Sequence, residues 1–178
     1  QDARMGLLLT RRLVLGLPLG LLMAVPVQAT EVTGRVVGVI DGDTIDVLTA
    51  KFETLRIRLS GIDAPELGQA FGRNAKAALS SLAFARAATV EWHKRDRYGR
   101  LVGKVLVEGR DIALEMLTLG MAWHYKQFES EQPAANRGRY QEAENRARAA
   151  RRGLWADAAP QPPWMYRGRH RGQKESPT

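Results

Sequence analysis

The chain has 178 residues, and its 27 lysines and arginines outnumber its 19 aspartates and glutamates, so the formal net charge at pH 7 is +8. It contains no cysteine, which excludes disulfide bonds as a source of stability. A basic surface attracts polyanions such as nucleic acids or acidic cell-surface polymers, and the charge alone does not separate these two partners.

Residues 1–29 have the three parts of a secretory signal peptide. Three arginines precede an apolar run at 13–25, and Ala29 ends a segment of small residues that suits cleavage. The loss of these three arginines and one aspartate would lower the formal charge from +8 to +6. The run is short for a bilayer roughly 30 Å thick and is broken by glycine and proline, so an uncleaved membrane anchor is the second interpretation. We expect a secreted or periplasmic protein without a stable anchor after cleavage.

The first half of the remaining chain is typical of β-strands. Residues 32–40 and 44–48 flank an Asp-Gly turn signal, which predicts a hairpin. Across 55–62, apolar residues alternate with Arg56 and Arg58, which places both arginines on the same face of a strand. A second hairpin is predicted from Trp92 to Val107, turning at Tyr98-Gly99.

The rest of the chain favours helices. Helical periodicity covers 71–88, 112–119 and 136–152. Asp111 is expected to cap the second of these helices and Gly120 to end it. We predict an α+β domain over 30–157, a five-stranded closed barrel with three helices, because closure removes exposed sheet edges. The basic Pro/Arg-rich tail at 158–178 has no apolar period and is predicted to be disordered.

Three segments carry acidic oxygens or guanidinium groups next to predicted strands. They are Asp41-Gly42-Asp43-Thr44, Arg56 to Glu66, and Asp96-Arg97-Tyr98-Gly99-Arg100. Strand ends and their loops present side chains from a rigid scaffold. Hard-metal ligands beside phosphate-binding arginines suggest a phosphodiesterase.

Six short motifs occur in a specific order: Ile40 to Thr44, Arg58 five residues before Asp63-Ala64-Pro65-Glu66, Phe71-Gly72, Asp96 to Arg100, Leu119 to Ala122, and Gly153-Leu154-Trp155. With these motifs, the chain from Val32 to Trp155 resembles the staphylococcal (micrococcal) thermonuclease family. The resemblance implies an OB-type five-stranded barrel with three helices and a calcium-dependent nuclease that cleaves DNA and RNA.

The resemblance also implies a metal site. The carboxylates of Asp43 and Asp63 and the backbone carbonyl of Ala64 would bind Ca²⁺, with waters completing its 6–8 oxygen ligands. The family often has threonine where this chain has Ala64, a change that a carbonyl ligand tolerates. Glu66 would be the general base that activates the attacking water.

Two arginines are expected to act on the phosphate. Arg58 and Arg100 would clamp it with guanidinium forks that lysine cannot reproduce, and Arg100 would also assist departure of the leaving oxygen. Asp41 and Thr44 are expected to support the ligands around the ion. Asp41 has an equal second interpretation, as the aspartate of its own turn.

Substrate contacts are expected at three further residues. Arg97 and Tyr98 would meet a terminal phosphate and a sugar or base, although Tyr98 could instead pack on its hairpin. Tyr125 is the candidate for the tyrosine that the family places against the nucleotide. We expect a monomer with DNA and RNA as its partners. The alternatives are a non-catalytic OB-fold module that binds single-stranded nucleic acid, and a basic surface protein that only holds acidic polymers.

Overall fold

The structure is a computed structural model that describes residues 30–174, with side chains described as far as Arg169. The predicted signal peptide and the last four residues lie outside this part of the chain. Between residues 30 and 174, no helix has both the length and the apolar character needed to cross a membrane.

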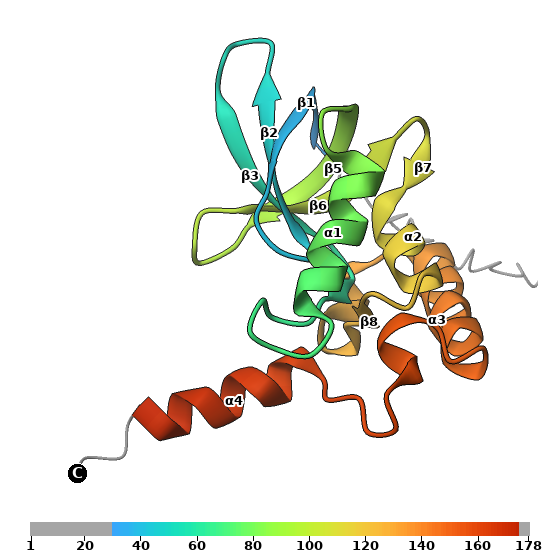
Figure 1. Cartoon of the computed structure of the whole chain (residues 1–178). Coiled ribbons are helices and arrows are strands. Elements are labelled where there is room, and N and C mark those ends of the chain that lie inside the picture. The colour runs from blue at the N-terminus through green and yellow to red at the C-terminus, as the bar shows by residue number, and fades with distance from the viewer. Residues whose placement is uncertain (1–29, 175–178) are drawn as a thin grey trace, which may run out of the picture.

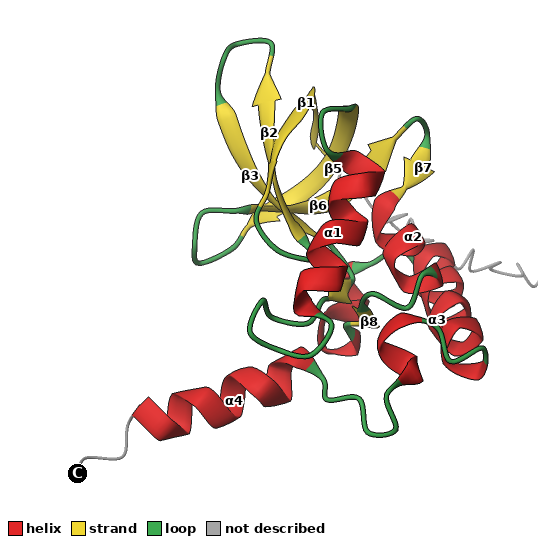
Figure 2. Cartoon of the chain, viewed as in Figure 1, coloured by secondary structure: helices red, strands yellow, loops and turns green. Residues whose placement is uncertain are grey.

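The described chain forms strands, four α-helices and two short 3₁₀ helices (Figures 1 and 2). The strands are β1 (Thr30–Val39), β2 (Thr44–Thr49), β3 (Thr54–Leu59), β4 (Ile62–Asp63), β5 (Ala87–Arg95), β6 (Leu101–Val107), β7 (Arg110–Asp111) and β8 (Trp123–His124). The helices are α1 (Gly72–Ala83), α2 (Ile112–Thr118), η1 (Lys126–Glu131), α3 (Ala134–Ala149), η2 (Gly153–Ala156) and α4 (Pro163–Lys174).

Five strands close into a barrel. Antiparallel pairs join β1 to β2, β1 to β5, β2 to β3, and β5 to β6. A parallel pair between β3 and β6, with Ile57 opposite Leu101, completes the ring. The short β4 and β8 form a separate antiparallel pair beside it. This topology confirms the predicted α+β fold with a five-stranded OB-type barrel.

The core follows the alternation of the strands. In β6, every second residue from Leu101 to Val107 is buried, while Val102, Lys104 and Leu106 between them are partly exposed. In β3, Ile57 and Leu59 point inward, which leaves the arginines on the outer face as predicted. Apolar residues of α1 and α2 join the same buried cluster, and Figure 2 shows α1, α2 and α3 gathered beside the barrel. The loops between the strands are thus attached to a packed core.

Both predicted ends of α2 are confirmed. The Asp111 side chain accepts a hydrogen bond from the backbone N–H of Leu114, which is the geometry of an N-cap. Gly120 has a φ of 67°, the left-handed conformation that glycine adopts without strain after a helix.

The first helix is shorter than predicted. It ends at Ala83 instead of residue 88, because Phe84 is extended and Ala85 has a φ of 61°. The Ala85 N–H donates to the carbonyl of Val36 in β1, and Ala88 pairs with residues of β1 and β6. Pairing within the barrel therefore overrides the helix propensity of this alanine-rich segment.

The prediction of a disordered tail is wrong over residues 163–174, which form α4, so the described chain has four α-helices instead of three. Pro163 occupies the first helical position, where its missing N–H costs no hydrogen bond. The Trp164 ring packs edge-on against Trp123, with ring centroids 5.6 Å apart. Tertiary contacts of this kind stabilise a helix that has no apolar period of its own.

A buried tyrosine links α3 to the start of α2. The hydroxyl of Tyr140 donates to the Asp111 carboxylate, with distances of 3.0 and 2.9 Å to its two oxygens, and Tyr140 is only 1% exposed. Burial and the negative charge of Asp111 both raise the pKa of Tyr140 above its usual range, so the hydroxyl stays a donor.

Replacing Tyr140 with phenylalanine is expected to lower the free energy of unfolding by about 1–3 kcal/mol, because the buried carboxylate of Asp111 loses its hydroxyl donor. Urea denaturation measures this change. Tyr98→Phe is the matched control, since Tyr98 is 66% exposed and should shift stability by less than about 0.5 kcal/mol. Equal stabilities for the two variants would contradict the prediction.

Candidate functional site

Most of the predicted site residues line one cleft with a volume of about 750 Å³. They come from the β1–β2 turn, the end of β3, β4 and the loop after it, the β5–β6 hairpin, and the segment after β8. The predicted residues on its wall are Asp41, Asp43, Arg58, Asp63, Glu66, Arg97, Tyr98, Arg100 and Tyr125. The other two, Thr44 and Ala64, contact Asp43 directly. The fold therefore brings segments that are far apart in the sequence to one cleft.

Asp43 is held in a single orientation at the β1–β2 turn. Its Oδ1 accepts from the Thr44 hydroxyl at 3.0 Å, and its Oδ2 accepts from the backbone N–H of Ala64 at 2.8 Å. A Cβ on Gly42 would lie 2.6 Å from the Cβ of Ala64 and 2.7 Å from that of Ala75. This close approach requires glycine and brings the turn against α1 and the Ala64 loop.

Arg58 organises the carboxylates from the end of β3. Its Nη1 donates to the carbonyls of Leu59 and Ile62, at 3.0 and 2.9 Å. Its Nη2 lies 2.9 Å from Asp63 Oδ1 and 3.2 Å from Asp43 Oδ2. Both terminal nitrogens thus contact the protein, whereas the sequence predicted that this fork would face a phosphate.

The carboxylates of Asp41, Asp43 and Asp63 lie close together and are shielded from solvent. Asp43 and Asp63 are 6% and 1% exposed. Burial raises the pKa of Asp63 above its ordinary value, although Arg167 and Arg58 oppose the shift. Burial and the charge of Asp43 raise the pKa of Asp41 to about 6. The Oδ1 of Asp41 also accepts from the Asp43 N–H at 3.0 Å, so it does cap its own turn.

Glu66 stands at the edge of the cleft, just beyond Pro65. Its side chain is 38% exposed, in contrast to the buried Asp63. Its backbone N–H donates to Oε1 of Gln69 at 3.2 Å, which fixes the loop before α1. One carboxylate of the cleft is therefore accessible to water while its neighbours are enclosed.

The β5–β6 hairpin presents Arg100. The Asp96 carboxylate accepts from the backbone N–H of Tyr98 at 2.9 Å and from Arg100 Nε at 2.7 Å. Burial would raise the pKa of Asp96, but the hydrogen bonds from Arg100 and Tyr98 outweigh burial and lower this pKa. Tyr98 is 66% exposed. The centroid of its ring lies 4.8 Å from Cζ of Arg97 and 5.3 Å from Cζ of Arg100. The tyrosine therefore packs on its own hairpin and still lines the cleft.

Helix α4 lines part of the cleft, and two of its side chains, Trp164 and Arg167, are site residues that the sequence did not predict. Trp164 stacks on Tyr125, with ring centroids 5.4 Å apart and planes 17° apart. Arg167 contacts Asp63 and Glu66. The spacing of the two residues, three apart on one helical face, was the available signal, but it becomes visible only once the tail is known to be helical.

The donors in the cleft fit a hard divalent cation. They are carboxylate oxygens, and Asp43 and Asp63 are both buried, where a bound cation stabilises negative charge. Between residues 30 and 169, no three acidic, histidine or cysteine side chains converge on one point. Two carboxylates would therefore need backbone carbonyls and waters to complete a calcium shell.

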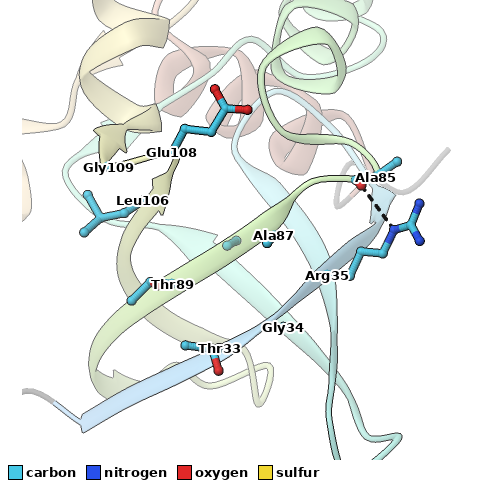
Figure 3. Close-up of a pocket in the computed structure, with 10 residues that line it drawn as sticks. Thr33, Gly34, Arg35, Ala85, Ala87, Thr89, Leu106, Glu108 and Gly109 are labelled. Carbon is cyan, nitrogen blue, oxygen red and sulfur yellow. Dashed lines mark hydrogen bonds between the residues drawn. The ribbon is translucent and has the colours of Figure 1, made fainter.

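A second hollow of similar volume is lined by residues of β1, of β5 and the loop before it, and of the end of β6 (Figure 3). Its wall consists mainly of alanine, glycine and threonine. Arg35 and Glu108 lie at opposite ends of it, and Arg35 donates to the carbonyl of Ala85 at 3.1 Å. It contains none of the predicted site residues, so the chemistry is concentrated in the first cleft.

Comparison with known proteins agrees with this geometry. A sequence model of the family described as staphylococcal nuclease homologue matches residues 56–157. An uncharacterized endonuclease of Escherichia coli O157:H7 is 41% identical over 145 residues, covering 81% of this chain and 90% of its own length. A micrococcal nuclease of Shigella flexneri is 40% identical over 156 residues, covering 83% of this chain and 86% of its own.

Proposed function

Because this chain belongs to the staphylococcal nuclease family, we propose that it is a nuclease that hydrolyses phosphodiester bonds of DNA and RNA with the help of Ca²⁺. The observation that carries the proposal is that two buried aspartates, an accessible glutamate and two arginines line one cleft. A module that only bound nucleic acid would need the arginines but not this acidic cluster.

The proposed ion ligands are the carboxylates of Asp43 and Asp63, the carbonyl of Ala64, and waters. Ca²⁺ bound there would supply positive charge for the phosphate oxygens, on which negative charge accumulates during hydrolysis. Thr44 and the backbone N–H of Ala64 orient the Asp43 carboxylate before any ligand binds. This preorganisation supports the assignment of Asp43.

Glu66 is the proposed general base. Its carboxylate is accessible to water at the edge of the cleft, and the rigid Asp63-Ala64-Pro65 segment holds it near the aspartates. It would orient the attacking water and accept a proton from it. The phosphoester oxygen that leaves would then need a cationic or acidic partner, which Arg100 can provide.

The two arginines have different proposed tasks. Asp96 binds Nε of Arg100, and Nη1 of Arg100 makes only a long hydrogen bond of 3.5 Å to the Thr44 hydroxyl, so we propose that the terminal nitrogens reach a phosphate. Arg58 already holds both aspartates, and we propose that it fixes their positions while adding its charge to the same phosphate site. Arg97, Tyr98 and Tyr125 also line the cleft and would contact sugar, base or terminal phosphate.

The proposed setting is outside the cytoplasm, in the periplasm or the medium, with the protein acting as a monomer. The basic n-region and apolar run of residues 1–29 support this proposal. Fractionation of cells that express the full chain, followed by mass analysis of the mature N-terminus, tests it.

The test of function is hydrolysis of plasmid DNA, single-stranded DNA and RNA by the purified protein. We expect cleavage in calcium and intact substrate in excess chelator, with activity restored when calcium is added back. Gel-shift binding measured under both conditions separates the alternative. Nucleic acid that is bound but intact in calcium would contradict the nuclease proposal and favour the OB-fold binding module.

A further inference from the structure

Helix α4 enters the same cleft that the proposed substrate and ion would use. Trp164, Arg167 and Gly168 all line it. Figure 1 shows the N-terminal end of α4 close to the loop that precedes α1, while its other end extends away from the barrel. Gln69 Nε2 donates to the carbonyl of Gln161 at 2.5 Å, which ties the start of this segment to the Glu66 loop. The helix is therefore attached at one end, directly over the site.

Trp164 covers Tyr125 in the way a nucleobase would. The indole is nearly parallel to the tyrosine ring, with planes 17° apart and centroids 5.4 Å apart. Nucleic-acid-binding proteins use exposed aromatic rings to stack bases in this geometry. Trp164 also meets Trp123 edge-on, which holds the indole in place. A base could stack on this side of Tyr125 only after Trp164 had moved.

Arg167 supplies positive charge at the carboxylates. Its Nη2 lies 2.8 Å from Asp63 Oδ2, and its Nη1 lies 3.2 Å from Asp63 Oδ1 and 2.7 Å from Glu66 Oε1. The bidentate pair engages both oxygens of Asp63, which is 1% exposed. A guanidinium in this position competes with any cation that Asp63 would bind, and it neutralises the proposed general base.

We propose that α4 is an intramolecular inhibitor, with Trp164 in the position of a base and Arg167 in the position of the cation. The inference rests on the proposed function, because it takes Asp63 as an ion ligand and Glu66 as the base. Calcium and nucleic acid would bind only to molecules in which α4 has moved away. The apparent dissociation constant then rises in inverse proportion to the open fraction.

The helix has features suited to opening. Gly168 lies inside it and weakens it by about 1 kcal/mol relative to alanine. Arg169, one turn beyond Met165, is exposed to solvent. Once released, Arg167 could pair with substrate phosphates, so a polyanion would favour the open state.

Calcium binding without nucleic acid tests the proposal most directly. Isothermal titration of wild type, Arg167→Ala and Arg169→Ala with calcium chloride compares variants that each lose one positive charge from the same helix. If α4 is closed about nine-tenths of the time, Arg167→Ala should bind calcium about tenfold more tightly than wild type. Arg169→Ala should match wild type within about twofold. Near-UV circular dichroism confirms that all three are folded.

Hydrogen exchange provides the second readout. In wild type, amides of residues 165–169 should lose protection when calcium is added, and also when a short single-stranded oligonucleotide is added in chelator. The Arg167→Ala variant should show weak protection there from the start.

The outcomes separate this inference from the proposed function. If wild type binds calcium and cleaves DNA, but Arg167→Ala binds calcium no more tightly and α4 stays protected, the inhibitor role is wrong and the nuclease assignment stands. If none of the three proteins binds calcium or cleaves DNA, both proposals are overturned.

Discussion

Replacing Glu66 with glutamine is expected to reduce turnover on single-stranded DNA by about 10²- to 10⁴-fold, the range in which a positioned general base contributes. Glutamine keeps the shape of the side chain and can still accept one hydrogen bond, but its amide cannot take up a proton from water. The binding of substrate should change much less, because the change removes an interaction made mainly in the transition state. The loss should therefore appear in kcat with KM nearly constant.

The measurement is steady-state cleavage of a fluorescent oligonucleotide in saturating calcium. Glu108→Gln is the matched control, since Glu108 is an exposed glutamate at the second hollow and its removal should change turnover by less than about twofold. The Glu66→Gln variant also removes one carboxylate partner of Arg167. Calcium affinity should be measured in parallel, so that any effect on α4 is kept apart from the chemistry. Turnover of Glu66→Gln equal to wild type would exclude Glu66 as the base.

Substituting lysine for Arg58 is expected to reduce turnover by at least about 10²-fold, the loss typical of removing one preorganised charge donor. Lysine keeps the positive charge, but its single ammonium cannot reach two carbonyls and two carboxylates at once. Asp43 and Asp63 would lose their common partner. The positions of both proposed ion ligands would then be less well defined, and calcium affinity should fall together with turnover.

Arg56→Lys is the matched control for this variant. Arg56 lies two residues earlier on the same face of β3, but it pairs with Asp46 at the surface and is 53% exposed. Exposed ion pairs contribute about 0–1 kcal/mol, so Arg56→Lys should retain nearly full turnover. Urea denaturation of both variants shows whether the loss comes from unfolding. A folded Arg58→Lys protein with wild-type turnover would place Arg58 outside the reaction.

The local pattern of the sequence was sufficient to predict the barrel and most of the cleft. Alternation in β3 put Arg58 on the outer face and Ile57 in the core, and the Asp-Gly turn placed Asp43 at the end of a hairpin. The Asp63 to Glu66 segment and the 96–100 hairpin reach the same cleft. These features depend on the residue types that favour turns and on the alternation of side chains along a strand. Both act over a few neighbouring residues and are therefore visible in the sequence.

Predictions failed where long-range contacts outweighed local preference. The alanine-rich segment after Ala83 has high helix propensity, but Ala88 gains strand partners on both sides in the barrel. The segment from Pro163 has no apolar period, yet Trp164 finds aromatic partners on β8 and beside it. The orientation of Arg58 could not be predicted either, because its partners include carbonyls whose direction depends on the turn between β3 and β4.

By itself, the sequence determined the family, the closed five-stranded barrel and the identity of the acidic and basic groups in the cleft. Only the tertiary structure decided that Arg167 contacts the carboxylate of Asp63, which lies 104 residues earlier in the chain. The physical reason is that a contact across this distance in the chain depends on where the whole barrel and the segment after α3 place the two side chains. No local period or turn signal encodes that position.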